Sequence, residues 1–182
     1  MKKVVKFGGS SLASAKQFKK VGEIIRGDKS RRFVVPSAPG KRHDKDEKVT
    51  DLLYQCYDGA ADGKSYKKIL EKIKERYAEI IDGLDINLNL DHEFATIEEN
   101  FLKKAGRDYA ASRGEYLNGL VTFYQQIHIL WCDGLRESFI DLLCYYKNLS
   151  FSNAGKQGGF GDNLWLFHSL FAGAWCMAWN HL

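Results

Sequence analysis

A lysine, two glycines and two serines stand together near the start of the chain, and this combination can hold a phosphate group. Lys6 ends a short β-branched run, Gly8 and Gly9 follow it, and Ser10 and Ser11 come next. Glycines let the backbone approach an anion closely, the N–H groups of a following helical turn point towards it, and the lysine adds a positive charge. The spacing is neither that of a Walker loop nor G-x-G-x-x-G. A plain tight turn therefore remains an alternative to an anion site.

The surrounding pattern predicts a βαβ unit that would position this loop. Residues 2–7 and 32–35 are expected to be strands, and residues 14–25 an amphipathic helix with Ser14 as its N-cap. Strand, helix and strand in quick succession favour a parallel sheet. Ligands of such sheets bind beyond the carboxyl ends of the strands. The glycine loop and residues 37–40 should therefore meet at one crevice.

The rest of the first 120 residues reads mostly as helix. Thr50 can cap the helix that follows a charge-rich connection over residues 41–48, which is expected to be solvated. Amphipathic helices are predicted over residues 65–84, 90–105 and 107–120, and residues 121–130 could extend the last of them. These helices suggest structure and carry no assigned chemistry, apart from an acid, Glu115, that lies among small and apolar residues.

Three motifs, in order along the chain, carry a family resemblance. They are Lys6-Phe7-Gly8-Gly9-Ser10-Ser11, then Val34-Val35-Pro36-Ser37-Ala38-Pro39-Gly40 followed by Val49-Thr50-Asp51-Leu52-Leu53, and finally Ser112-Arg113-Gly114-Glu115-Tyr116-Leu117. Up to about Gly119 the chain resembles the aspartate kinases, within the amino-acid kinase superfamily. The resemblance implies an α/β fold for residues 1–120, a three-layer α/β/α sandwich around a mainly parallel sheet.

The resemblance also implies an activity and its cofactors. The activity is transfer of the γ-phosphoryl group of MgATP to the side-chain carboxylate of L-aspartate, the first step towards lysine, threonine and methionine. ATP and Mg²⁺ are the implied cofactors, L-aspartate and ATP the implied small-molecule partners, and the intact enzyme is implied to be a homo-oligomer. No protein metal ligand is assigned. The implied catalytic residue is Lys6, and the implied phosphate- and ATP-binding residues are Lys6, Phe7, Gly8, Gly9 and Ser10.

On the acceptor side, the resemblance implies that three residues bind aspartate. Glu115 would pair with the ammonium group of the substrate, and Thr50 would help to hold a carboxylate. Ser37 lines the same site by the same resemblance. Capping would explain Thr50 equally well, and a solvent-facing glutamate is the commoner case for Glu115.

The composition changes abruptly after residue 120. Residues 1–120 hold 43 of the 50 charged side chains, whereas all four tryptophans and three of the four cysteines come later. The family's second-half motifs are not found there, so residues 121–182 are left as an unassigned aromatic-rich tail, expected to follow a truncation or a frame change near Gly119. We therefore expect little or no kinase activity from this chain by itself. Two alternatives stay open: another amino-acid kinase with a different acceptor, and a non-catalytic module that binds a partner through the aromatic tail.

Charge and cysteine usage exclude several other classes. A net charge of only +4 gives no reason to expect nucleic acid or a membrane surface as a partner. The four cysteines have no C-x-x-C spacing, which disfavours a zinc site and favours reduced thiols in a cytoplasmic protein. Residues 164–182 approach the length of a membrane span, but polar interruptions there, including His168 and Asn180, disfavour insertion.

Overall fold

The computed structural model describes residues 1–63 and 66–132. The chain divides into two compact units, Met1–Ile129 and Leu130–Leu182. Of the predicted aromatic tail, only residues 121–132 are among the described residues. The elements are β1 (Lys3–Phe7), the 3₁₀ turn η1 (Gly9–Leu12), α1 (Ala15–Arg26), β2 (Arg31–Pro36), α2 (Val49–Ala61), α3 (Lys67–Leu84), α4 (Asp91–Leu102) and α5 (Arg107–Cys132).

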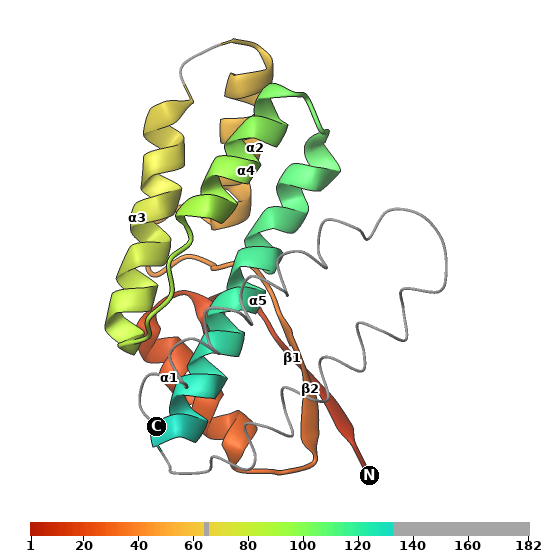
Figure 1. Cartoon of the computed structure of the whole chain (residues 1–182), viewed down its shortest axis with the longest axis vertical. Coiled ribbons are helices and arrows are strands. Elements are labelled where there is room, and N and C mark those ends of the chain that lie inside the picture. Colours follow the sequence, from red (N-terminus) through yellow and green to blue (C-terminus); the bar gives the residue numbers. More distant parts are fainter. Residues whose placement is uncertain (64–65, 133–182) are drawn as a thin grey trace, which may run out of the picture. The chain divides into compact units, whose positions relative to one another are not determined.

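The predicted βαβ unit is present. Strands β1 and β2 pair in parallel, with Val5 opposite Val34 and Phe7 opposite Pro36. Helix α1 connects them, and its first residue follows Ser14, the predicted N-cap position, although the Ser14 side chain makes no capping hydrogen bond. The α/β class with a parallel sheet is therefore confirmed (Figure 1).

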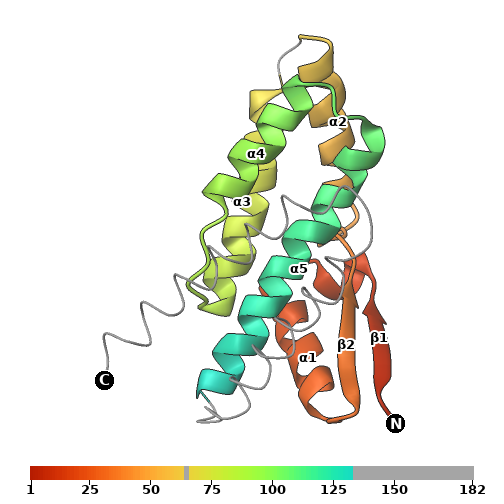
Figure 2. The same ribbon diagram turned by 45° about the vertical axis from the view of Figure 1, so that its right-hand side comes forward.

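The two faces of the sheet differ. Phe7 packs against the hydrophobic core, whereas Val4 and Val35, on the opposite face, are 67% and 46% exposed. Figure 2 shows the described helices on one side of β1 and β2. The second helical layer of the predicted three-layer sandwich is thus not supplied by the described residues.

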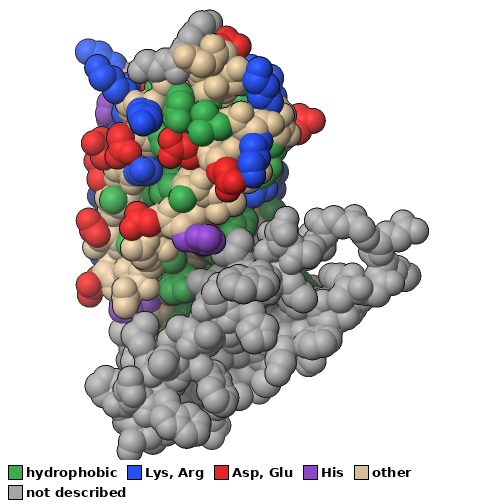
Figure 3. All heavy atoms as spheres, turned by 45° about the horizontal axis from the view of Figure 1, so that its top comes forward, with side chains coloured by type: hydrophobic (Ala, Val, Ile, Leu, Met, Phe, Trp, Pro, Cys, Tyr) green, Lys and Arg blue, Asp and Glu red, His purple; other side chains and the backbone are tan. Residues whose placement is uncertain are grey.

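A helical layer carries most of the core. Amphipathic stripes on α2, α3, α4 and α5 bury their apolar residues against one another, because each helix repeats such residues every three or four positions. Tyr77 of α3 packs edge-on against Phe94 of α4, and Phe101 packs edge-on against Tyr57 and Tyr109. Figure 3 shows charged side chains of both signs scattered over one face of these helices, with hydrophobic side chains between them. Each of these helices therefore buries one face in the core and exposes the other.

The predicted helix positions hold, with two changes at the boundaries. Helix α4 stops at Leu102, earlier than the predicted residue 105, and Lys104 and Gly106 then adopt positive φ values of 59° and 105°. Left-handed backbone of this kind breaks the helical hydrogen-bond pattern. Helix α5 continues past residue 120 to Cys132, as the apolar pattern after Leu120 allowed. Among the described residues, no helix is long and apolar enough to cross a membrane.

Candidate functional site

The loops that follow β1 and β2 touch each other, as the parallel topology predicted. The backbone N–H of Ser37 donates to the carbonyl oxygen of Phe7 over 3.0 Å, which continues the strand pairing by one step. Three residues further along the loop after β2, and two further along the glycine loop, the N–H of Gly40 donates to the carbonyl oxygen of Gly9 over 2.9 Å. The glycine loop and residues 37–40 therefore form one continuous backbone surface at the carboxyl edge of the sheet.

Two glycines make this contact possible. A Cβ atom added at Gly40 would lie 2.7 Å from the carbonyl carbon of Gly9 and 2.8 Å from the nitrogen of Ser10. A Cβ atom added at Gly9 would lie 2.9 Å from the carbonyl oxygen of Ala38. Such distances are too short for any side chain, and the obstructing atoms are backbone. Gly8, by contrast, has no atom within 4 Å of an added Cβ, so packing does not require a glycine there.

Helix α2 fixes the other end of residues 37–40, which we call the second loop. The N–H of Val49, the first residue of α2, donates to the carbonyl oxygen of Pro39 over 3.1 Å. The predicted capping role of Thr50 is wrong, because the helix begins at Val49 and its N-cap is Lys48. Thr50 lies inside the first helical turn, half-buried, and its hydroxyl has no hydrogen bond with any described residue. That hydroxyl therefore has no protein partner among the described residues that would compete with a ligand.

Helix α5 approaches the loop through a small residue of the third motif. A Cβ atom at Gly114 would lie 2.6 Å from Cβ of Ala38 and 3.3 Å from Cδ1 of Leu53. The buried Tyr77 hydroxyl of α3 donates to the carbonyl oxygen of Gly114 over 3.0 Å. Gly114 thus lets α5 lie directly on Ala38, and Glu115 is the next residue along the helix.

Asn118 is a site-supporting residue that the sequence analysis missed. It is fully buried on α5, and its Nδ2 donates to the carbonyl oxygen of Ser37 over 2.6 Å. The signal lay in its spacing, because a residue four positions after Gly114 falls on the same face of the helix. The second loop is therefore held by α5 at both Ser37 and Ala38.

The polar side chains that the sequence analysis selected are left without partners. Lys6, Ser10 and Glu115 are exposed, and Ser37 and Thr50 are half-buried. Among the described residues, none of these five side chains has a hydrogen bond or ion pair with another described group. The backbone of the loops around them is held by hydrogen bonds, whereas these side chains have no such partner.

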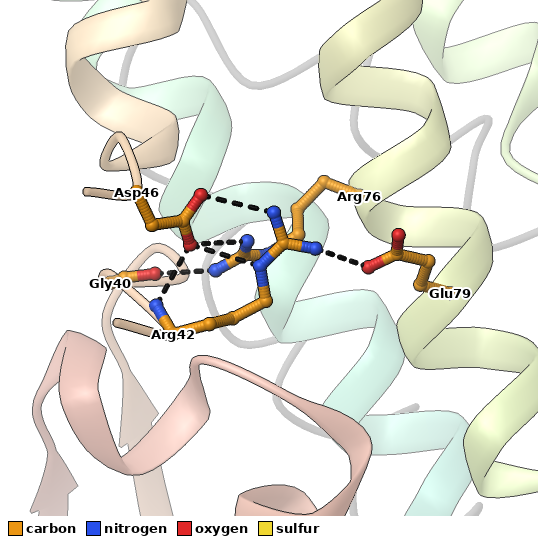
Figure 4. Close-up of polar contacts among 5 residues, drawn as sticks. All are labelled: Gly40, Arg42, Asp46, Arg76 and Glu79. Atoms are coloured by element: carbon orange, nitrogen blue, oxygen red, sulfur yellow. Dashed lines mark hydrogen bonds and ion pairs between the residues drawn. The ribbon is translucent and has the colours of Figure 1, made fainter. Parts of the chain in front are cut away.

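An ion-pair network between the connection over residues 41–48 and helix α3 was not anticipated (Figure 4). Asp46, in the connection expected to be solvated, accepts hydrogen bonds from Arg42 and from Arg76 of α3. Its side chain is only 11% exposed. The hydrogen bonds from Arg42 above all, with those from Arg76, hold the pKa of Asp46 below its usual range against the opposing effect of burial. The connection is thus anchored where full solvation was expected.

No protein metal centre is evident in the described part of the chain, where no three His, Cys, Asp or Glu side chains gather closely enough to hold an ion. A bound molecule can also supply ligands to a divalent ion. Phosphate oxygens are the usual source of such ligands for Mg²⁺.

Comparison with known proteins gives partial matches. No family model matches the chain. Aspartokinase 3 of Bacillus subtilis (strain 168) is 47% identical over 88 residues, which are 48% of this chain and 19% of that protein. The crystal structure of Clostridium acetobutylicum aspartate kinase superposes with a TM-score of 0.65 and 46% identity, covering 68% of this chain and 28% of that one.

A more distant structure agrees in fold. Escherichia coli aspartokinase III, solved in complex with aspartate and ADP, superposes with a TM-score of 0.53 at 23% identity over 67% of this chain and 28% of that one. The chain thus spans less than a third of the length of these relatives. The similarity to aspartate kinases covers part of the chain only, as the three motifs indicated.

Proposed function

We propose that residues 1–120 are the acceptor-binding and phosphate-binding part of an aspartate kinase. The observation that carries this proposal is the contrast between a locked pair of loops and the unpaired side chains of Lys6, Ser37, Thr50 and Glu115 around them. The proposed reaction moves the γ-phosphoryl group of ATP onto the side-chain carboxylate of L-aspartate. The 46% and 47% identities to aspartate kinases support this choice among phosphoryl transfers.

Phosphoryl transfer needs little covalent help from a protein, because positioning and charge neutralisation provide most of the rate enhancement. Lys6 would hold the transferring phosphate as charge builds on its oxygens. The backbone N–H groups of Gly8, Gly9 and Ser10 would donate to the same phosphate. Mg²⁺, bound through the nucleotide, would neutralise further phosphate charge.

The acceptor would lie against α2 and α5. Glu115 would pair with the ammonium group of aspartate, and the Thr50 hydroxyl would donate to one of its carboxylates. Ser37 would line the same pocket from the second loop. A role in lysine, threonine and methionine biosynthesis, a cytoplasmic location and a homo-oligomeric intact enzyme belong to the same proposal.

Isothermal titration calorimetry of the full chain with L-aspartate tests the acceptor site. We expect binding that weakens about tenfold or more in Glu115→Gln, because that change removes a charge-assisted contact worth at least about 1.4 kcal/mol. Asp108→Asn is the matched control, since Asp108 is another exposed acid on α5. Equal weakening by both variants, or no binding at all, would refute the acceptor assignment. Preference for a longer or different carboxylic acid would favour another amino-acid kinase.

A hydroxamate assay with MgATP, L-aspartate and hydroxylamine tests turnover. We expect little product from this chain alone, because its resemblance to the family stops near Gly119. Aspartyl hydroxamate well above the level of a Lys6→Ala variant would show that the described half of the site is sufficient. That outcome would overturn the expectation of inactivity and support the role of Lys6.

A further inference from the structure

One arginine on the helical layer is buried, although the surface of that layer offers ample solvent. Arg76 lies on α3, is 5% exposed, and belongs to a helix to which the sequence assigned no chemistry. Its Nη1 donates to Oδ2 of Asp46 over 2.7 Å, and its Nη2 donates to the carbonyl oxygen of Gly40 over 2.6 Å. Figure 4 shows the guanidinium reaching from α3 towards both partners.

The second of these contacts leads directly to the phosphate-binding loop. Arg76 holds the carbonyl of Gly40, and the N–H of the same residue donates to Gly9 over 2.9 Å. The Cα of Gly40 also faces Gly9 and Ser10 so closely that no side chain fits between them. Gly40 is therefore fixed on one side by the guanidinium and on the other by the glycine loop.

The charges around Arg76 keep it in place. Asp46 also accepts hydrogen bonds from the backbone nitrogen, Nε and Nη2 of Arg42, over 2.8, 2.9 and 3.0 Å. Arg42 pairs in turn with Glu79 of α3. Two cations and two anions thus balance across the loop and the helix. A buried ion pair is costly to desolvate and is weak support for stability alone, so its presence here favours a role in positional specificity.

We propose that Arg76 is a positioning residue for the glycine loop. The guanidinium fixes the position of Gly40, and Gly40 in turn fixes the position of the Gly9–Ser10 backbone, whose N–H groups would donate to a phosphate. This inference rests on the proposed function for the phosphate, but the contact between Arg76 and Gly40 can be tested separately. Arg76 itself touches no reacting group in this proposal.

Amide hydrogen exchange of the full chain tests the contact. In Arg76→Gln we expect the Gly40 amide to exchange at least about tenfold faster. The charged hydrogen bond from Arg76 to the Gly40 carbonyl is then lost, so local opening of the loop costs less free energy. Amides in the core of α4 should keep their rates. Arg76→Lys should give an intermediate rate, because an ammonium group lacks the planar fork that serves two partners.

Arg107→Gln is the matched control, since Arg107 also pairs with an aspartate, Asp58, but in an exposed position away from the loop. It should leave the Gly40 rate unchanged. An unchanged Gly40 rate in Arg76→Gln, or a uniform loss of protection along the chain, would overturn the proposal. If Arg76→Gln does not fold, the comparison of Arg76→Lys with the wild type decides on the same readout.

A second arm connects the contact to the proposed site. Binding of magnesium pyrophosphate, followed through the Gly9 and Ser10 amide resonances, should weaken about tenfold in Arg76→Gln and not in Arg107→Gln. Equal binding by Arg76→Gln and the wild type would overturn the positioning role. If the wild type binds no pyrophosphate while Gly40 exchange still depends on Arg76, the proposed phosphate site fails and the positioning contact stands.

Discussion

Substitution of Gly114 by alanine should destabilise the chain and disturb the second loop together. The new methyl group would lie 2.6 Å from Cβ of Ala38 and 3.3 Å from Cδ1 of Leu53, whereas carbon atoms in contact prefer about 3.5–4.0 Å. Ala38 is 6% exposed and belongs to a turn that is hydrogen-bonded on both sides, so it has little room to withdraw. Overpacking of this kind costs about 1–3 kcal/mol.

The intrinsic preference of the helix works in the opposite direction. Alanine is favoured over glycine inside a helix by about 1 kcal/mol, so the expected net loss for Gly114→Ala is up to about 2 kcal/mol. Gly119 is a matched control on the same helix, because nothing lies within 4 Å of a Cβ added there. Gly119→Ala should therefore gain up to about 1 kcal/mol.

Urea unfolding of the full chain measures both changes through the transition midpoint at constant slope. The two variants should move the midpoint in opposite directions, and Gly114→Ala should also weaken L-aspartate binding, because Ala38 is joined directly to Ser37. Equal stabilisation by both alanines would refute the reasoning, since it would mean that Ala38 yields without cost and that α5 is not held at this distance from the loop.

Three further outcomes follow from single groups. Because the pKa of Asp46 lies below its usual range, its charge stabilises the fold above about pH 4, so Asp46→Asn should cost about 3 kcal/mol near neutral pH. In urea titrations, the difference in free energy of unfolding between the wild type and Asp46→Asn should narrow as the pH falls below about 4. A constant difference would contradict a stabilising role for the Asp46 charge. Burial above all, and the Glu98 carboxylate, raise the pKa of Cys56 to about 12, so iodoacetamide should modify the Cys56 peptide only after unfolding, as mass spectrometry can check. Tyr77→Phe should lower the free energy of unfolding by about 1 kcal/mol through the lost bond to Gly114, and an unchanged urea midpoint would count against that bond.

Periodicity and short motifs predicted the helical layer, the parallel strands and the meeting of the two loops. Those features depend on local sequence, on the alternation of side chains in a strand and on the handedness of crossovers. Thr50 was misplaced because a threonine is a common N-cap, whereas the helix start depends on the bond from Val49 to Pro39, across the nine residues between them.

The burial of Arg76 and Asn118 could not be predicted from local sequence, because it too depends on contacts with distant parts of the chain. Arg76 sits among lysines and glutamates on an amphipathic helix, where a solvated position is the ordinary expectation. Its burial depends on Gly40 and Asp46, which lie thirty or more residues earlier in the chain. Asn118 likewise acquires its role from Ser37, 81 residues away. Local patterns identify which residues form the helices, but non-local loops decide which polar residues on them become buried.

The second loop is the point at which these non-local contacts converge. Each of its four residues is fixed from outside the loop: Ser37 by Phe7 and Asn118, Ala38 by Gly114, Pro39 by Val49, and Gly40 by Gly9 and Arg76. A turn held at every residue loses little entropy when a ligand binds, and its groups need little reorganisation as charge develops. The helices therefore contribute to the proposed site without supplying most of its ligand contacts. Because the anchors come from β1, η1, α2, α3 and α5, a substitution on any of these elements can reach the site through one backbone hydrogen bond or one close packing contact.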